Sequence, residues 1–65
     1  MEFNLEEVVK EIEAIWLKNP RWGQDQIAED MGLATYTLRR IMKKKVGELK
    51  ITTKMKLLAW IRDNK

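Results

Sequence analysis

The sequence predicts a small all-α domain, because apolar residues recur at the three- and four-residue spacing of a helix in four separate segments. Proline or glycine follows each of the first three segments, as expected where a helix ends. The chain has 65 residues and no cysteine, so no disulfide can stabilise it. We therefore expect one domain over residues 1–65 whose stability depends on a single apolar core.

The first predicted helix covers about residues 5–18. Asn4 is suited to cap its start, with Glu7 three residues later as the second member of a capping box. The apolar stripe of this helix consists of Leu5, Val8, Val9, Ile12, Ile15 and Trp16. Pro20 ends the helix, because the residue before a proline is pushed out of the helical region. We expect Trp22, in the connector that follows, to fold back onto the first helix.

The second and third predicted helices are short and lie close together in the chain. The second covers about residues 24–31, and Gly32 follows it at a position that suits a left-handed helix end. The third covers about residues 35–45, and Gly47 is expected to end it in the same way. The inward-facing residues of these two helices are expected to be Ile27, Ala28, Met31, Leu38, Ile41 and Met42.

A fourth helix is predicted over about residues 53–63, capped by Thr52 or Thr53. Its apolar side is either the set Met55, Leu58 and Ile61 or the pair Leu57 and Trp60. Because an apolar surplus on a terminal helix can mark a partner site, we expect any homodimer or protein contact to use Leu57 and Trp60. The three core helices are expected to bury Ile12, Trp16, Trp22, Ile27, Met31, Leu38 and Ile41 together.

The residue types that are absent exclude most enzyme chemistry. Histidine, cysteine and serine do not occur, which removes the usual general base, the best nucleophiles and the commonest zinc ligands. We therefore expect no catalytic residue, no metal site and no cofactor. No apolar run approaches the ~20 residues that span a bilayer, and no signal-peptide pattern opens the chain. We expect a cytoplasmic protein without a membrane partner.

Charge is divided between the two halves of the chain. Residues 1–33 carry three basic and eight acidic side chains, whereas residues 34–65 carry ten basic and two acidic ones, for a net charge of +3. A basic half attracts polyanions, and an acidic half keeps the remaining surface from binding them.

The stretch from Gln24 to Lys43, QDQIAEDMGLATYTLRRIMK, meets the demands of a helix-turn-helix. Two helices that cross through a tight turn need a small residue at the crossing, where Ala28 stands. The turn needs a residue that tolerates positive φ four positions later, where Gly32 stands. The inner positions must be apolar, and they are Ile27, Met31, Leu33, Leu38 and Ile41.

This stretch resembles the helix-turn-helix of phage repressors. Extended through LRRIMKKKVG to Gly47, it also resembles the first helix-turn-helix of AraC-type regulators, with a leucine, an arginine, a lysine and a glycine at similar spacing. Met42 stands where AraC-type proteins prefer phenylalanine, and Ala34 stands where both groups favour a capping serine. The resemblance implies a DNA-binding transcriptional regulator or repressor associated with the nucleoid. In related repressors the position of Gln24 grips a phosphate.

A recognition helix lies in the major groove with its N-terminal residues against base edges. The candidates for base contacts are Thr35, Tyr36, Arg39 and Arg40. The candidates for phosphate contacts are Gln24, at the start of the second helix, and three lysines further along the third helix. The lysines are Lys43, Lys44 and Lys45. The sequence therefore predicts sequence-specific binding of double-stranded DNA.

An alternative from another class is a protein-interaction module, an adaptor or anti-activator that keeps the helix-turn-helix shape without binding DNA. The basic third helix favours DNA over this alternative. Binding to an anionic membrane surface fits less well, because the fourth segment lacks a clean division between lysines and bulky apolar residues. RNA binding lacks an aromatic platform.

Overall fold

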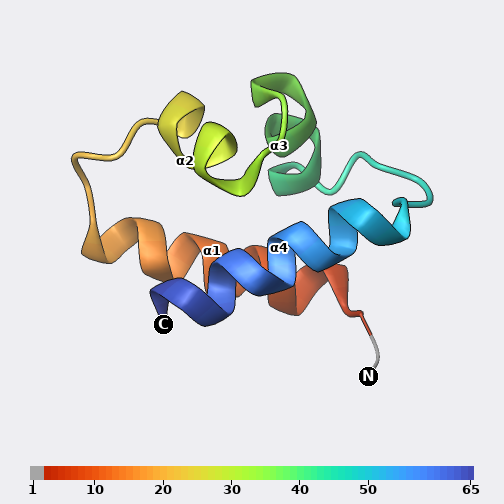
Figure 1. The fold of residues 1–65 in the computed structure, drawn as a ribbon, viewed down its shortest axis with the longest axis horizontal. Coiled ribbons are helices and arrows are strands. Elements are labelled where there is room, and N and C mark those ends of the chain that lie inside the picture. Colours follow the sequence, from red (N-terminus) through yellow and green to blue (C-terminus); the bar gives the residue numbers. More distant parts are fainter. Residues whose placement is uncertain (1–2) are drawn as a thin grey trace.

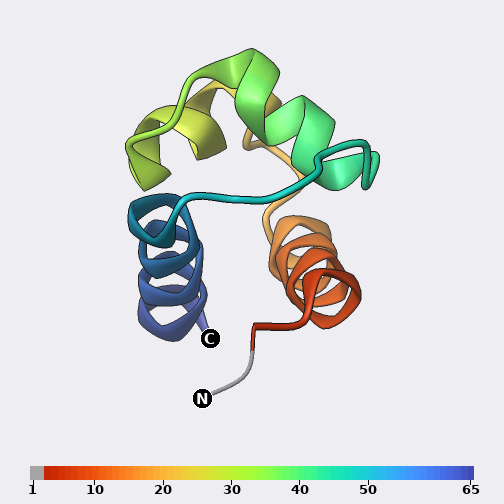
Figure 2. The same cartoon turned by 90° about the vertical axis from the view of Figure 1, so that its right-hand side faces the viewer.

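The computed structural model describes residues 3–65, which form four helices and contain no strand. The helices are α1 (Leu5–Lys18), α2 (Gln24–Met31), α3 (Thr35–Met42) and α4 (Ile51–Asn64). The long helices α1 and α4 lie side by side and run in the same direction, and α2 and α3 pack together across one side of them (Figures 1 and 2). This arrangement confirms the predicted all-α class. No helix within residues 3–65 has the length and apolar character needed to cross a membrane.

Helix α1 begins and ends where the sequence predicts. The side-chain oxygen of Asn4 accepts a hydrogen bond from the backbone N–H of Glu7 at 3.2 Å, which satisfies one of the free donors of the first turn. At the other end, the backbone N–H of Asn19 donates to the Trp16 carbonyl at 2.9 Å, and its side-chain amide donates to the Ile15 carbonyl at 3.0 Å. Pro20 follows directly, so the chain leaves the helix here.

Gly32 adopts the left-handed conformation that the sequence predicts, with φ 79° and ψ 30°. Its N–H donates to the Glu29 carbonyl at 3.0 Å, and the N–H of Leu33 donates to the Ala28 carbonyl at 2.8 Å. This pair of bonds is a Schellman motif, which satisfies carbonyls that the end of a helix leaves free. The motif turns the chain sharply, so that α3 begins at Thr35, three residues after Gly32.

Helix α3 ends at Met42, which corrects the prediction that it continues to about residue 45 and stops at Gly47. The left-handed residue is Lys44, with φ 59°, whereas Gly47 has no positive φ. Lys44 donates to the Ile41 carbonyl at 2.9 Å and Lys45 to the Arg40 carbonyl at 3.0 Å, which makes a second Schellman motif. The early turn brings the half-buried side chains of Val46 and Leu49 against the core.

Helix α4 starts at Ile51 with Lys50 as its N-cap residue, so neither Thr52 nor Thr53 caps it as predicted. No side chain makes a capping hydrogen bond at this end. The start of α4 therefore depends on what the helix buries rather than on a local cap.

The buried side of α4 is the pair Leu57 and Trp60, together with Ile61. Leu57 is fully buried and Trp60 is 5% exposed, so the expectation that these two residues form a partner surface is wrong. In the other set that was considered for the apolar side of α4, Leu58 is half-buried and Met55 is 63% exposed.

One core joins all four helices. Its buried members are Val8, Val9, Ile12, Ile15, Ile27, Ala28, Met31, Leu38, Ile41, Leu57, Trp60 and Ile61. Trp16 and Trp22, which were expected to be fully buried, are half-buried at the edge of this core. The Trp16 indole N–H donates to the Trp22 carbonyl at 2.7 Å, which holds the connector against α1 as predicted. The Trp22 ring meets the Trp60 ring edge-on, with 6.3 Å between centroids.

Candidate nucleic-acid interface

The orientation of α3 is determined by its two fully buried residues, Leu38 and Ile41. These side chains point into the core, where α3 packs against α2 and α1. The opposite side of α3 faces solvent on the side of the molecule away from α1 and α4 (Figures 1 and 2). Any ligand of α3 must therefore approach from that side.

The four residues predicted to contact bases lie on this outer side. Tyr36, Arg39 and Arg40 are exposed, and Thr35, the first residue of the helix, is half-buried. Residues three and four apart are neighbours on a helix, so Thr35 lies beside Arg39, and Tyr36 lies beside Arg39 and Arg40. The structure thus brings all four onto one face of α3. Tyr36 is 63% exposed, so its ring contributes little to the core.

The three lysines predicted to contact phosphate are exposed but do not lie on α3 as expected. Lys43 is the C-cap residue, and Lys44 and Lys45 belong to the left-handed turn beyond it. They therefore extend the basic surface past the C-terminal end of α3. Gln24 is the half-buried first residue of α2, at the other end of the α2–α3 layer.

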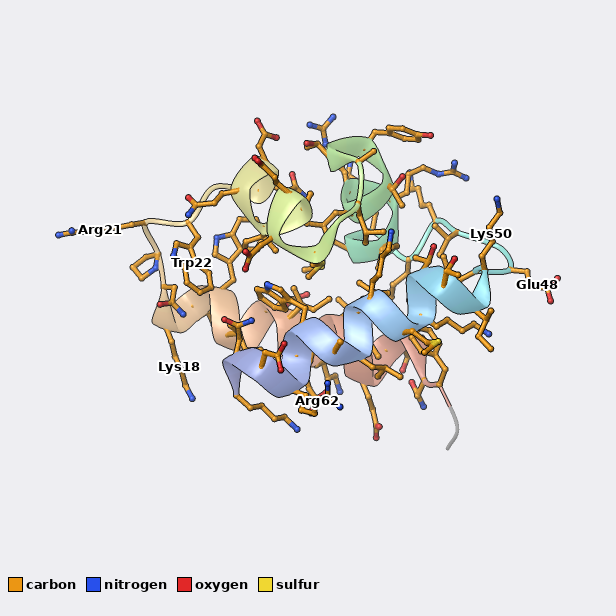
Figure 3. The ribbon with its side chains drawn as sticks, viewed as in Figure 1. Lys18, Arg21, Trp22, Glu48, Lys50 and Arg62 are labelled. Carbon is orange, nitrogen blue, oxygen red and sulfur yellow. The ribbon has the colours of Figure 1, made fainter. Side chains whose placement is uncertain are left out.

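Lys50 is a further candidate that the sequence interpretation missed. It is exposed at the start of α4, and its side chain points to the same side as α3 in Figure 3, whereas Lys18 and Arg62 point the opposite way. The signal available in the sequence was its place in the basic half of the chain, five residues after Lys45.

The charge of this surface has one sign. No acidic residue occurs between Thr35 and Gly47, a segment that contains five basic side chains. The ion pairs within residues 3–65 join Lys65 to Glu11 at 2.6 Å and Arg62 to Asp63 at 3.8 Å, so neither uses the basic residues of α3 or its turn. The acidic side chains of α2 are Asp25, Glu29 and Asp30. The Trp60 indole N–H donates to the carboxylate of Asp30 at 3.0 Å.

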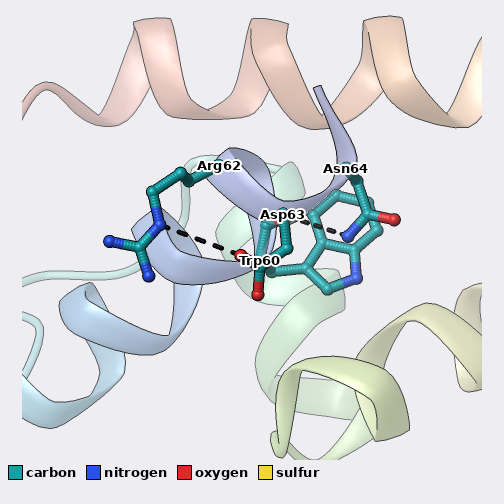
Figure 4. A network of polar contacts seen from close by, with 4 residues as sticks. All are labelled: Trp60, Arg62, Asp63 and Asn64. Atoms are coloured by element: carbon teal, nitrogen blue, oxygen red, sulfur yellow. Dashed lines mark hydrogen bonds and ion pairs between the residues drawn. The ribbon is translucent and has the colours of Figure 1, made fainter.

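Helix α4 braces the turn that positions α3, a role that the sequence did not reveal. The ammonium group of Lys56 donates to the Gly32 carbonyl at 3.1 Å, where a cation also complements the negative end of the α2 dipole. One turn later, the contact from Trp60 to Asp30 fixes the last turn of α2. The Asn64 side-chain amide donates to the Trp60 carbonyl at 2.8 Å and secures the end of α4 (Figure 4).

Comparison of the chain with protein-family models, with curated proteins and with solved structures finds no match. The described residues also bring together no group of three or more acidic side chains that could hold a metal ion. The exposed basic surface of α3 and its turn is therefore the candidate functional site.

Proposed function

We propose that this chain binds double-stranded DNA, with α2, the Gly32 turn and α3 acting as a helix-turn-helix and α3 entering the major groove. The observation that carries the proposal is the exposed, uniformly basic face formed by α3 and the turn that follows it. In this role the protein is a binding module and not an enzyme, and a small transcriptional regulator is the proposed biological setting.

The dimensions of α3 support this role. The eight residues of α3 make a helix about 12 Å long. A helix with its side chains is about 10–12 Å in diameter, which fits the width of about 12 Å of the major groove of B-DNA. Tyr36, Arg39 and Arg40 on its outer face would meet base edges, where an arginine pairs with O6 and N7 of guanine through two hydrogen bonds. Thr35, at the start of the helix, would contact a thymine methyl group or a phosphate.

Phosphate contacts come from both ends of the α2–α3 layer. Lys43, Lys44 and Lys45 follow α3, and Gln24 begins α2. Groups on either side of a recognition helix would reach the two backbones that border the groove, which sets the orientation of the helix without reading sequence. Lys50, at the start of α4, adds a positive charge on the same side of the molecule.

An adaptor would more often carry an apolar groove on α3, whereas the outer face of α3 carries Tyr36, Arg39 and Arg40. Leu57 and Trp60, the predicted contact site for a protein partner, are buried in the core. DNA binding through α3 is the function that the arrangement supports best.

The test is a fluorescence-anisotropy titration against a random-sequence duplex and against a preferred duplex selected from that pool. Between about 50 and 200 mM salt, log K should fall linearly with log salt. Lys43→Ala and Lys45→Ala should weaken binding to both duplexes and reduce the slope by about 0.9 for each lost contact. Arg39→Ala and Arg40→Ala should instead cost about 1–3 kcal/mol on the preferred duplex and relax its base preference.

The matched control is Lys18→Ala, which removes an exposed positive charge at the end of α1, on the side away from α3 (Figure 3). It should leave both affinities and the salt slope close to those of the parent. A parent protein that shows no salt-dependent binding to any duplex would contradict the proposal. Equal losses for Lys18→Ala and Lys43→Ala would show attraction by net charge alone.

A further inference from the structure

A second surface lies on the face opposite α3, where α1 and α4 run side by side. An open groove of about 590 Å³ follows this face, which we call the underside. Its lining residues are Glu11, Met55, Leu58, Ala59, Ile61, Arg62 and Lys65. Figure 3 shows Arg62 pointing away from the α2–α3 layer, so the groove opens away from the proposed DNA surface.

Apolar side chains are exposed on α4 in the groove and along the helix toward its start. Ile51, Met55 and Leu58 are spaced four and three residues apart, which places them in one row along the helix. Ile51 is 72% exposed and Met55 is 63% exposed, while Leu58 is half-buried. The underside therefore presents an apolar row that the described part of the chain leaves largely in solvent.

The charges beside this row have opposite signs on the two helices, and one pair already meets within the chain, where the Lys65 ammonium lies 2.6 Å from the Glu11 carboxylate. Glu7 and Glu11 lie one turn apart on α1, and Arg62 and Lys65 lie near the end of α4. A face with one acidic and one basic helix is complementary to itself when a second copy is turned about a twofold axis parallel to the helices. In that arrangement α1 of each copy meets α4 of the other, as an isologous interface requires.

We propose that a second copy of this chain binds to the underside and forms a twofold dimer centred on Met55 and Leu58. The underside is about as long as the longest axis of the molecule, 30 Å, and about as wide as its shortest axis, 18 Å. These dimensions give about 540 Å² for the whole face, less than the roughly 800 Å² that each partner buries in a stable interface, so we expect a dimer that forms only at high protein concentration. The apolar row would form its centre, and the charged pairs would form its rim.

This dimer carries its two α3 surfaces on opposite ends. The underside lies on one side of the core and α3 on the other, so joining two undersides points the two α3 helices away from each other (Figure 2). One straight duplex cannot contact both. The dimer would instead hold two duplexes together, a conclusion that also depends on the proposed function.

The first experiment measures mass in solution without DNA, by light scattering between about 1 μM and 1 mM protein. The parent should approach twice the monomer mass of 7.8 kDa. Met55→Glu, which puts a charge at the centre of the interface, should remain monomeric. Arg62→Glu, at a side chain that is 81% exposed, should weaken the dimer by facing acidic α1 of the partner. The matched control is Leu17→Glu, at a leucine that is exposed outside the groove and should not affect dimer formation.

The second experiment asks whether duplex attached to beads captures a second, labelled duplex. The parent and Leu17→Glu should capture it, whereas Met55→Glu should bind each duplex singly without joining them. A monomeric parent, or a Met55→Glu protein that dimerises like the parent, overturns the proposed interface. A dimer that binds DNA but joins no duplexes overturns the opposed arrangement. A dimer that forms as described but binds no duplex supports the interface and overturns the proposed function alone.

Discussion

Replacing Gly32 tests the turn on which the orientation of α3 depends. Its φ of 79° is the conformation that costs an L-amino acid about 1–2 kcal/mol, because Cβ approaches the following carbonyl oxygen. Substitution of glycine by alanine also lowers the conformational entropy of the unfolded chain, which offsets about 0.4–1 kcal/mol of this cost. We therefore expect Gly32→Ala to lower the free energy of unfolding by about 1 kcal/mol.

Gly32→Val should cost more, about 2–3 kcal/mol, because a β-branched residue fits this region of backbone space worst. An added Cβ would lie 3.7 Å from the Lys56 ammonium nitrogen and 3.8 Å from its nearest carbons, which is ordinary contact. Alanine therefore adds conformational strain alone. The branches of valine would also crowd the Lys56 side chain, which donates to the Gly32 carbonyl. For a domain with about 3–10 kcal/mol of total stability, this loss is large.

The assay is thermal unfolding followed by circular dichroism, with urea titration for the free energy. A loss of 1 kcal/mol lowers the melting temperature of a domain this small by about 4–8 °C. Gly47→Ala is the matched control, because Gly47 has no positive φ and nothing lies within 4 Å of its added Cβ. That change should leave stability unchanged or raise it by up to about 1 kcal/mol. Gly32→Ala and Gly47→Ala proteins that unfold at the same temperature would refute the reasoning.

Four further substitutions, the last of them a control, are expected to change the free energy of unfolding in different directions. Ala34→Ser should raise the free energy of unfolding by about 0.5–2 kcal/mol in urea titration, because the N-cap of α3 has no side-chain acceptor. Lys44→Gly should raise the free energy of unfolding by about 1 kcal/mol, because glycine adopts the left-handed backbone of this position without strain. The same change should reduce the salt slope of DNA binding by about 0.9, because it removes a positive charge. Urea titration measures the first effect and anisotropy titration the second. Leu57→Ala should cost about 2–5 kcal/mol in the same melts, run at a protein concentration where the chain is monomeric. Met55→Ala on the exposed side of α4 should then stay within about 0.5 kcal/mol; equal effects would mean that the buried side of α4 is wrongly assigned.

The parts of the fold that follow from local chemistry could be predicted from the sequence. Asn4 caps α1, Pro20 follows its end, and Gly32 takes the left-handed position, since each outcome depends on residues within one turn. The outer face of α3 could be predicted for the same reason. Once Leu38 and Ile41 point inward, helical geometry determines which residues face solvent.

The parts that depend on distant contacts could not be predicted. Apolar residues occur around most of α4, so its periodicity does not identify the buried side; the contacts of Trp60 with Asp30 and Trp22 decide it. Gly47 looked like the natural end of the third helix, but the chain turns earlier, at Lys44, in a conformation that lysine rarely adopts, and this turn brings Val46 against the core. That difference moves the lysines from α3 to the turn beyond it.

Chemical-shift mapping of the ¹⁵N-labelled protein with a DNA duplex tests the central claim most directly, because it reports which surface contacts DNA residue by residue. The proposed function predicts that amide shifts concentrate in residues 35–45, with a second, smaller set at the start of α2. It also predicts that residues 6–14 of α1 change little. Shifts centred on α1 and α4, or no shifts at saturating duplex in low salt, would contradict DNA binding through α3.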